Sequence, residues 1–128
     1  MKSTLIGEEA AEQLVRTCRT ASGDNLRSIT YFTPTEYDQL YLRQDLDRDA
    51  DISTFIGAEM HSFKLVQDAY RESELGEHEF TIRSFENGYL LRVASENEGI
   101  FVTTDSITLQ EFDSIATALT KTLETWRE

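Results

Sequence analysis

The stretch Glu79–Asp105 constrains the fold more than any other part of this chain. Phe80 and Ile82 alternate with Thr81 and Arg83, and two further short apolar-rich runs follow. The three runs are separated by Glu86-Asn87-Gly88 and by Glu96-Asn97-Glu98-Gly99. An Asn-Gly pair between alternating runs is a strong signal for a β-hairpin, and turns this short join antiparallel strands. We therefore expect a three-stranded antiparallel meander, with a left-handed glycine available in each turn. Its strands are predicted at Phe80–Arg83, Tyr89–Ser95 and Ile100–Thr104.

A second hairpin is expected upstream of the meander. Leu26–Phe32 is rich in β-branched and aromatic residues, which favour strands. The sequence Thr33-Pro34-Thr35-Glu36 supplies turn chemistry with the only proline of the chain. Tyr37–Leu46 follows as the second strand, centred on the letters QLYLR. Pro34 and the aromatic residues around it disfavour a helix here.

Three segments have apolar residues at helical spacing of about 100° per residue: Glu8–Ala21, Ile52–Ser73 and Leu109–Arg127. Gly23 is placed to end the first helix. Thr108 and Glu111 form a capping box at the start of the last helix. The order predicts an α+β fold, α-β-β-α-β-β-β-α, with a five-stranded antiparallel sheet and flanking helices in a single domain over residues 1–128. If the meander is the scaffold of that sheet, its core positions must be buried, namely Phe80, Ile82, Leu91 and Val93.

The predicted second helix carries apolar residues on two sides. Its main stripe includes Ile52, Phe55, Ile56, Phe63, Val66 and Tyr70. A thinner stripe of Ala58, Leu65 and Ala69 lies nearly opposite and is either incidental or a contact face for another chain. Glu59 falls inside the main stripe, where a carboxylate is costly unless it is paired. We expect Glu59 either at the solvent margin of that stripe or bound to an arginine of the sheet.

The charge balance is strongly acidic. Asp and Glu number 24 against 12 Lys and Arg, a net charge of −12, and only three of the cations are lysines. Such self-repulsion destabilises a compact state in dilute salt and is screened in concentrated salt. The pattern is typical of proteins from salt-accumulating halophiles and predicts the cytoplasm of a halophilic archaeon, with an ordinary acidic mesophilic protein as the alternative. No basic patch indicates nucleic-acid binding, and no apolar run is long enough to span a membrane or to form a signal peptide.

The residues that could carry chemistry do not form a recognisable catalytic motif. His61 and His78 fall on different predicted elements, and neither neighbours a nucleophile motif. Cys18 lies in the middle of an apolar helical stripe, so we interpret it as a small core residue. Asp45, Asp47, Asp49 and Asp51 alternate in DLDRDAD, but both possible calcium-loop registers lack the required Gly and Glu. We expect a solvated loop there, and predict no enzyme activity, metal site or cofactor.

The order of elements resembles the roadblock/LC7 family and, more broadly, the profilin-like group. The stretches Tyr41–Arg43, Asp51-Ile52 and Tyr70–Arg83 are also similar to small haloarchaeal proteins without an assigned activity. Roadblock-type domains dimerise through their second helix and an adjacent strand, and serve as platforms for small GTPases or for motor and signalling complexes. The resemblance implies a non-enzymatic homodimer with a protein partner of that class. The expected interface residues are Ala58, Leu65 and Ala69.

A second hypothesis comes from a different class of protein. A PAS-like sensor would hold a small ligand between the sheet and a helix, in a pocket of roughly 300 Å³ or more. The predicted lining consists of Phe55, Phe63, Tyr89 and Phe101.

Overall fold

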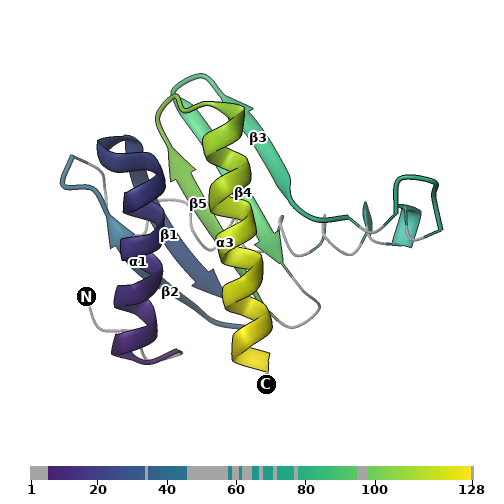
Figure 1. Ribbon diagram of the computed structural model, residues 1–128, viewed down its shortest axis with the longest axis horizontal. Helices are drawn as coiled ribbons and strands as arrows, with labels where there is room; N and C mark the ends of the chain where they lie inside the picture. The colour runs from purple at the N-terminus through teal and green to yellow at the C-terminus, as the bar shows by residue number, and fades with distance from the viewer. Residues whose placement is uncertain are drawn as a thin grey trace.

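A five-stranded antiparallel sheet forms the centre of the molecule, with α1 and α3 side by side on one of its faces (Figure 1). The computed structural model describes residues 6–33, 35–45, 78–94 and 98–127, together with positions 58, 61, 65, 66, 68–70 and 72–76. The strands follow the order β2-β1-β5-β4-β3. Chain order gives α1 Glu8–Ser22, a 3-10 turn η1 Gly23–Asn25, β1 Leu26–Phe32, β2 Tyr37–Leu42, β3 Thr81–Phe85, β4 Gly88–Ala94, β5 Gly99–Thr104 and α3 Leu109–Arg127.

The predicted α+β architecture is confirmed. The described positions between 58 and 70 are helical, in the segment where the second helix was expected. β2 is shorter than predicted and ends at Leu42, because its partner β1 begins at Leu26 and the last registered pair is Ser28 with Leu42. No described helix is long and apolar enough to cross a bilayer.

The two glycines that were expected in left-handed turns lie in strands instead. Gly88 and Gly99 do not have positive φ, and both belong to strands. The turn between β3 and β4 contains only Glu86 and Asn87, because Gly88 already pairs with Phe85. A Cβ on Gly88 would run into the carbonyl oxygen of Thr104, and one on Gly99 would lie 2.5 Å from Cζ of Phe32. Both positions need glycine for close packing of the sheet rather than for a left-handed turn.

The main core lies between the sheet and the two helices. Leu14 and Cys18 of α1 and Leu119 of α3 are buried in it, and the Tyr89 and Phe112 rings meet edge to face at 5.3 Å. Leu91 and Val93 are buried there too, while Phe80, which lies just before β3, and Ile82 are half-buried against the same cluster. The meander is therefore the scaffold that the sequence predicted.

The opposite face of the sheet carries a smaller cluster. Phe32, Leu90 and Phe101 are buried together, with the two phenyl rings 5.3 Å apart. Alternate residues of a strand point to opposite faces, so this cluster is separated from the helix-covered core by the thickness of the sheet. Arg92 belongs to the same face because it pairs with Phe101 across β4 and β5, and it is only 1% exposed.

α3 begins at a complete capping box. The Glu111 backbone N–H donates to Oγ1 of Thr108 at 3.1 Å, and the Thr108 N–H donates to Oε1 of Glu111 at 2.8 Å. Two backbone donors that the helix itself cannot satisfy are thus paired. The box confirms the sequence prediction and fixes where α3 starts over the sheet.

An ion cluster ties together the ends of three strands. Asp105, directly after β5, accepts from Nη1 of Arg43 at 2.6 Å and from Nη1 of Arg27 at 2.9 Å. Arg43 follows β2 and also donates to the Asp24 carbonyl oxygen at 3.0 Å. The two guanidinium groups, Arg43 first, hold the pKa of Asp105 below its usual value. The cluster joins segments that are distant in sequence at one end of the sheet.

Candidate interaction surfaces

Of the four alternating aspartates that were rejected as a calcium loop, only Asp45 lies in the described part of the chain. No group of three or more His, Cys, Asp or Glu side chains within it could hold a metal ion. Asp45 instead accepts from Nε of Arg43 at 2.7 Å, which lowers its pKa. Asp47, Asp49 and Asp51 lie outside the described residues, so the expectation of a solvated loop stays a prediction there.

Cys18 has the setting of a structural residue. Its side chain is completely buried between α1 and the rest of the core. Burial raises the pKa of the thiol to about 12, because the thiolate would lose its hydration. Since the thiolate is the reactive form, Cys18 is unsuited to nucleophilic chemistry in the folded protein.

His78 takes part in a short polar chain before β3. Its Nε2 lies 2.8 Å from Oγ1 of Thr81, and the same oxygen accepts from Nη2 of Arg92 at 3.0 Å. Burial, followed by the nearby Arg92 charge, lowers the pKa of His78. The arrangement favours a neutral imidazole that orders the entry to β3. His61 is exposed at a helical position, and Glu59 lies outside the described residues.

The aromatic residues predicted to line a ligand pocket do not share one site. Tyr89 pairs with Thr104 and packs against Phe112 under α3. Phe101 is three residues before Thr104 on β5, so it points to the other face, where it contacts Phe32. The predicted lining was wrong on this point because it was assembled from residue type and not from strand register. Phe55 and Phe63 lie outside the described residues.

The predicted interface positions are all exposed. Ala58, Leu65 and Ala69 occupy helical positions, and the Leu65 side chain is 58% exposed. Tyr70 and Leu75 are exposed in the same part of the chain, and Leu75 reaches 87%. The sequence prediction did not include Leu75, because it lies beyond the predicted helix Ile52–Ser73. An apolar residue between Glu74 and Gly76 could still have indicated an exposed contact.

β3 is an edge strand of the described sheet. Among the described strands it pairs only with β4, so one side of its backbone has no strand neighbour (Figure 1). Phe85 at its end is 58% exposed. An edge strand with exposed apolar residues is a ready template for pairing with another chain. The described helical positions 58–70 lead into β3 along the chain.

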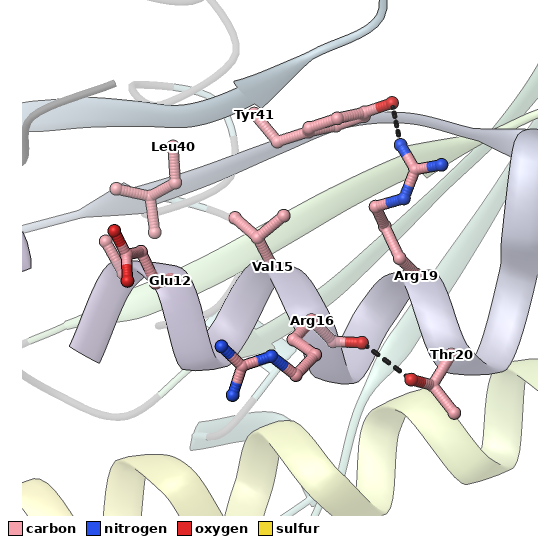
Figure 2. Close-up of a pocket in the computed structure, with 8 residues that line it drawn as sticks. Glu12, Val15, Arg16, Arg19, Thr20, Leu40 and Tyr41 are labelled. Atoms are coloured by element: carbon pink, nitrogen blue, oxygen red, sulfur yellow. Dashed lines mark hydrogen bonds between the residues drawn. The ribbon is translucent and has the colours of Figure 1, made fainter. Parts of the chain in front are cut away.

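A groove between α1 and β2 was not foreseen from the sequence. It has a volume of about 610 Å³, and Figure 2 shows Arg19 reaching from α1 toward Tyr41 on β2. Arg19 donates from Nη1 to the Tyr41 hydroxyl at 2.8 Å, and its guanidinium carbon lies 5.5 Å from the centre of that ring. The groove is lined by Ala11, Glu12, Val15, Arg16, Arg19, Thr20, Leu40 and Tyr41. The sequence offered only Arg16 and Arg19 one turn apart beside an apolar stripe as a signal. The contact of Arg19 with Tyr41 depends on how α1 and β2 pack and could not be read from it.

Comparisons with known proteins agree with this fold. A family model described as "Domain of unknown function (DUF7522)" matches residues 12–124. The structure of the gliding protein MglB from Thermus thermophilus is similar, with a TM-score of 0.70 at 12% identity over 96% of this chain and 94% of that one. A structure described as MglB with tetrameric arrangement gives a TM-score of 0.66 at 12% identity, covering 98% of each chain. The search of curated proteins found no match. These likenesses support the roadblock/LC7-like fold expected from the order of elements.

Proposed function

The chain belongs to the DUF7522 family, and from that premise we propose that it is a non-enzymatic regulatory domain that acts as a homodimer. Each protomer would contribute the second helix and the β3 edge to the interface. The protein would then present a platform to a signalling partner of the small-GTPase class. The observation that carries this proposal is the exposed apolar surface that precedes β3, an edge strand among the described strands. Leu65 in that helical segment is 58% exposed.

The physical argument starts from the exposed apolar side chains. Leu65, Tyr70 and Phe85 are each about half exposed or more, all within the segment that ends with β3. Burying such side chains against another chain is favourable by about 25 cal/mol per Å² of apolar surface. Pairing two β3 edges would also extend the sheet from one protomer into its partner. A two-fold dimer satisfies both requirements with one self-complementary patch.

The comparisons support the regulatory part of the proposal by analogy of fold. One similar structure is described as a tetrameric arrangement, which makes assembly of the fold into oligomers reasonable for this chain. Roadblock-type domains serve as platforms for small GTPases, so a GTPase or another signalling protein is the expected partner. Fold alone does not fix function, and the partner class therefore rests on this analogy.

The acidic surface supports an origin in a high-salt cytoplasm. The described acidic side chains are exposed or half-buried, and none is fully buried. A net charge of −12 therefore lies largely on the surface, where concentrated salt screens it. We place the protein in the cytoplasm of a halophilic archaeon on this basis.

Introducing a charge at the proposed interface tests the dimer. Leu65→Glu should convert a dimer into a folded monomer, because two buried carboxylates at a two-fold contact are strongly unfavourable. Leu109→Glu is the matched control, since Leu109 is also exposed but lies at the start of α3. Light scattering in molar KCl should give half the mass for Leu65→Glu and an unchanged mass for Leu109→Glu. An unchanged dimer in the Leu65 variant would remove this interface from consideration.

A further inference from the structure

We propose that the groove between α1 and β2 binds an acidic segment of a partner protein, one that combines carboxylates with an apolar anchor side chain. This inference rests on the partner-binding part of the proposed function and is independent of dimerisation. It assigns a surface and a chemistry to a partner that the fold alone does not specify.

The bottom of the groove is apolar. Ala11 of α1 and Leu40 of β2 are buried, and Val15 is half-buried between them. A volume of about 610 Å³ has room for a few apolar side chains or a short stretch of peptide. An apolar side chain that fills it would gain hydrophobic stabilisation without displacing charged groups.

The side of the groove near Tyr41 is positively charged and pre-arranged. The hydrogen bond to the Tyr41 hydroxyl and the packing over its ring hold the Arg19 guanidinium in place (Figure 2). Its ion pair with Asp24 is long, at 3.7 Å, and Asp24 is fully exposed, so this pair leaves the guanidinium available to another carboxylate. Arg16, one turn earlier, also lines the groove but points away from Tyr41 (Figure 2), and it makes no ion pair within the described part of the chain.

Arg16 and Arg19 are two exposed cations on the same helix in an acidic protein. The chain has a net charge of −12, while Arg27 and Arg43 are committed to Asp105 and Arg92 is buried. Glu12 lies beside Leu40 at the other end of the groove from Arg19, as Figure 2 shows. A bound segment would therefore place its carboxylates toward Arg19 and away from Glu12. Arginine is well suited to this task because its planar donors match a carboxylate.

The position of the groove favours a polypeptide over an enclosed small molecule. It is open to solvent and adjoins β2, which forms the edge of the sheet opposite to β3. A small ligand needs most of its surface buried, whereas a peptide can lie along an open groove beside an edge strand. In the proposed dimer through β3 both grooves would stay accessible, and the dimer would present two of them.

Fluorescence anisotropy with short labelled peptides tests the inference. The probe is a fluorescein-labelled peptide made of Leu and Glu, compared with a Leu and Lys peptide and a Ser and Glu peptide. We expect the Leu and Glu peptide to bind at least about tenfold more tightly than either control, since both the apolar and the charged contacts contribute. The double variant Arg16→Glu with Arg19→Glu should weaken that binding about tenfold or more.

Matched variants separate a local effect from a global one. Lys121→Glu on α3 changes the net charge in the same direction at an exposed site, by half as much as the double arginine variant, and should leave binding unchanged. Circular dichroism checks that each variant is folded. Equal binding of all three peptides, or equal binding by the double arginine variant and Lys121→Glu, would overturn the inference. So would self-association of the protein that disappears in the double variant, because the groove would then hold a second copy of the chain.

The experiments distinguish an error in the groove assignment from an error in the proposed dimer. Leu65→Glu should abolish dimerisation and retain binding of the Leu and Glu peptide. A wild-type protein that is dimeric but fails to bind the peptide would contradict the groove assignment alone. A wild-type protein that is monomeric but binds the peptide would contradict the dimer alone.

Discussion

Arg43 donates to Asp105 across 2.6 Å and thereby joins the end of β2 to the end of β5, two strands that are not neighbours in the sheet. Arg27 lies at the start of β1, the strand between them, and donates to the same carboxylate. The cluster is half-buried, with side-chain exposures of 23%, 26% and 35% for Arg43, Arg27 and Asp105. It therefore works as a clamp on one end of the sheet and not as a free anion site.

Asp105→Asn should lower the free energy of unfolding by about 1–2 kcal/mol at neutral pH, a figure reduced for partial solvent screening. Because the folded-state pKa of Asp105 is below its ordinary value of 3.8, the stabilisation is complete above that value. It is lost as the pH falls through the lowered folded-state pKa. The free energies of unfolding of the wild type and of Asp105→Asn, measured in urea, should therefore become equal in strong acid. Asp45→Asn is the control, because it removes a 60% exposed partner of the same Arg43, and it should change the free energy of unfolding little. A larger loss of stability in Asp45→Asn than in Asp105→Asn would contradict the clamp.

The capping box should contribute measurably to α3. Thr108→Ala and Glu111→Ala each remove one of the two reciprocal bonds and should each cost about 1 kcal/mol in denaturant unfolding. The double variant should cost less than the sum, because each side chain supports the other. Thr108→Ser keeps the hydroxyl and should stay within a few tenths of a kcal/mol of the wild type. If Thr108→Ala leaves the free energy of unfolding unchanged, water satisfies the backbone donors of α3 as well as the cap does, which would contradict this prediction.

Cys18 should react only when the protein opens. Burial raises the thiol pKa to about 12, so almost no thiolate is present in the folded protein at mildly alkaline pH. We expect alkylation by iodoacetamide, followed by mass spectrometry, to be negligible under native conditions and to increase in urea along the unfolding curve. Fast modification of the folded protein would contradict the assignment of Cys18 to the core.

The stability of the protein should increase with salt concentration. Raising KCl from about 0.1 M to about 1 M shortens the screening length from about 10 Å to about 3 Å and weakens repulsion between surface carboxylates. The melting temperature should rise over that range. Glu124→Gln, which removes an exposed acid near the C-terminal end of α3, should narrow the difference between the two salt conditions. A melting temperature that does not change with salt would contradict the view that screening of the acidic surface stabilises this protein.

Local chemistry explains what the sequence could predict. α3 and its cap depend on residues a few positions apart, so Leu109–Arg127 was predicted with its observed bounds. β1 was recognised equally well from its β-branched and aromatic residues. The order of elements then indicated the sheet, because short turns leave few ways to connect antiparallel strands.

Features that depend on contacts between distant segments could not be predicted. Asp105 meets Arg43 across 62 positions and Arg27 across 78, and no periodicity links them. The groove between α1 and β2 likewise joins Arg19 to Tyr41 across 22 positions. The placement of Tyr89 and Phe101 on opposite faces of the sheet follows from the alternation of side chains along a strand once the register of β4 and β5 is known. Gly88 and Gly99 show the same limit, because tertiary packing and not turn geometry demands them.

Sedimentation equilibrium of the wild-type protein in molar KCl tests the central claim most directly. The proposed interface through the second helix and β3 predicts a mass twice that of one chain, with dissociation only on dilution. A single mass equal to one chain across the whole concentration range would contradict the homodimer. The exposed Leu65 would then require a different partner.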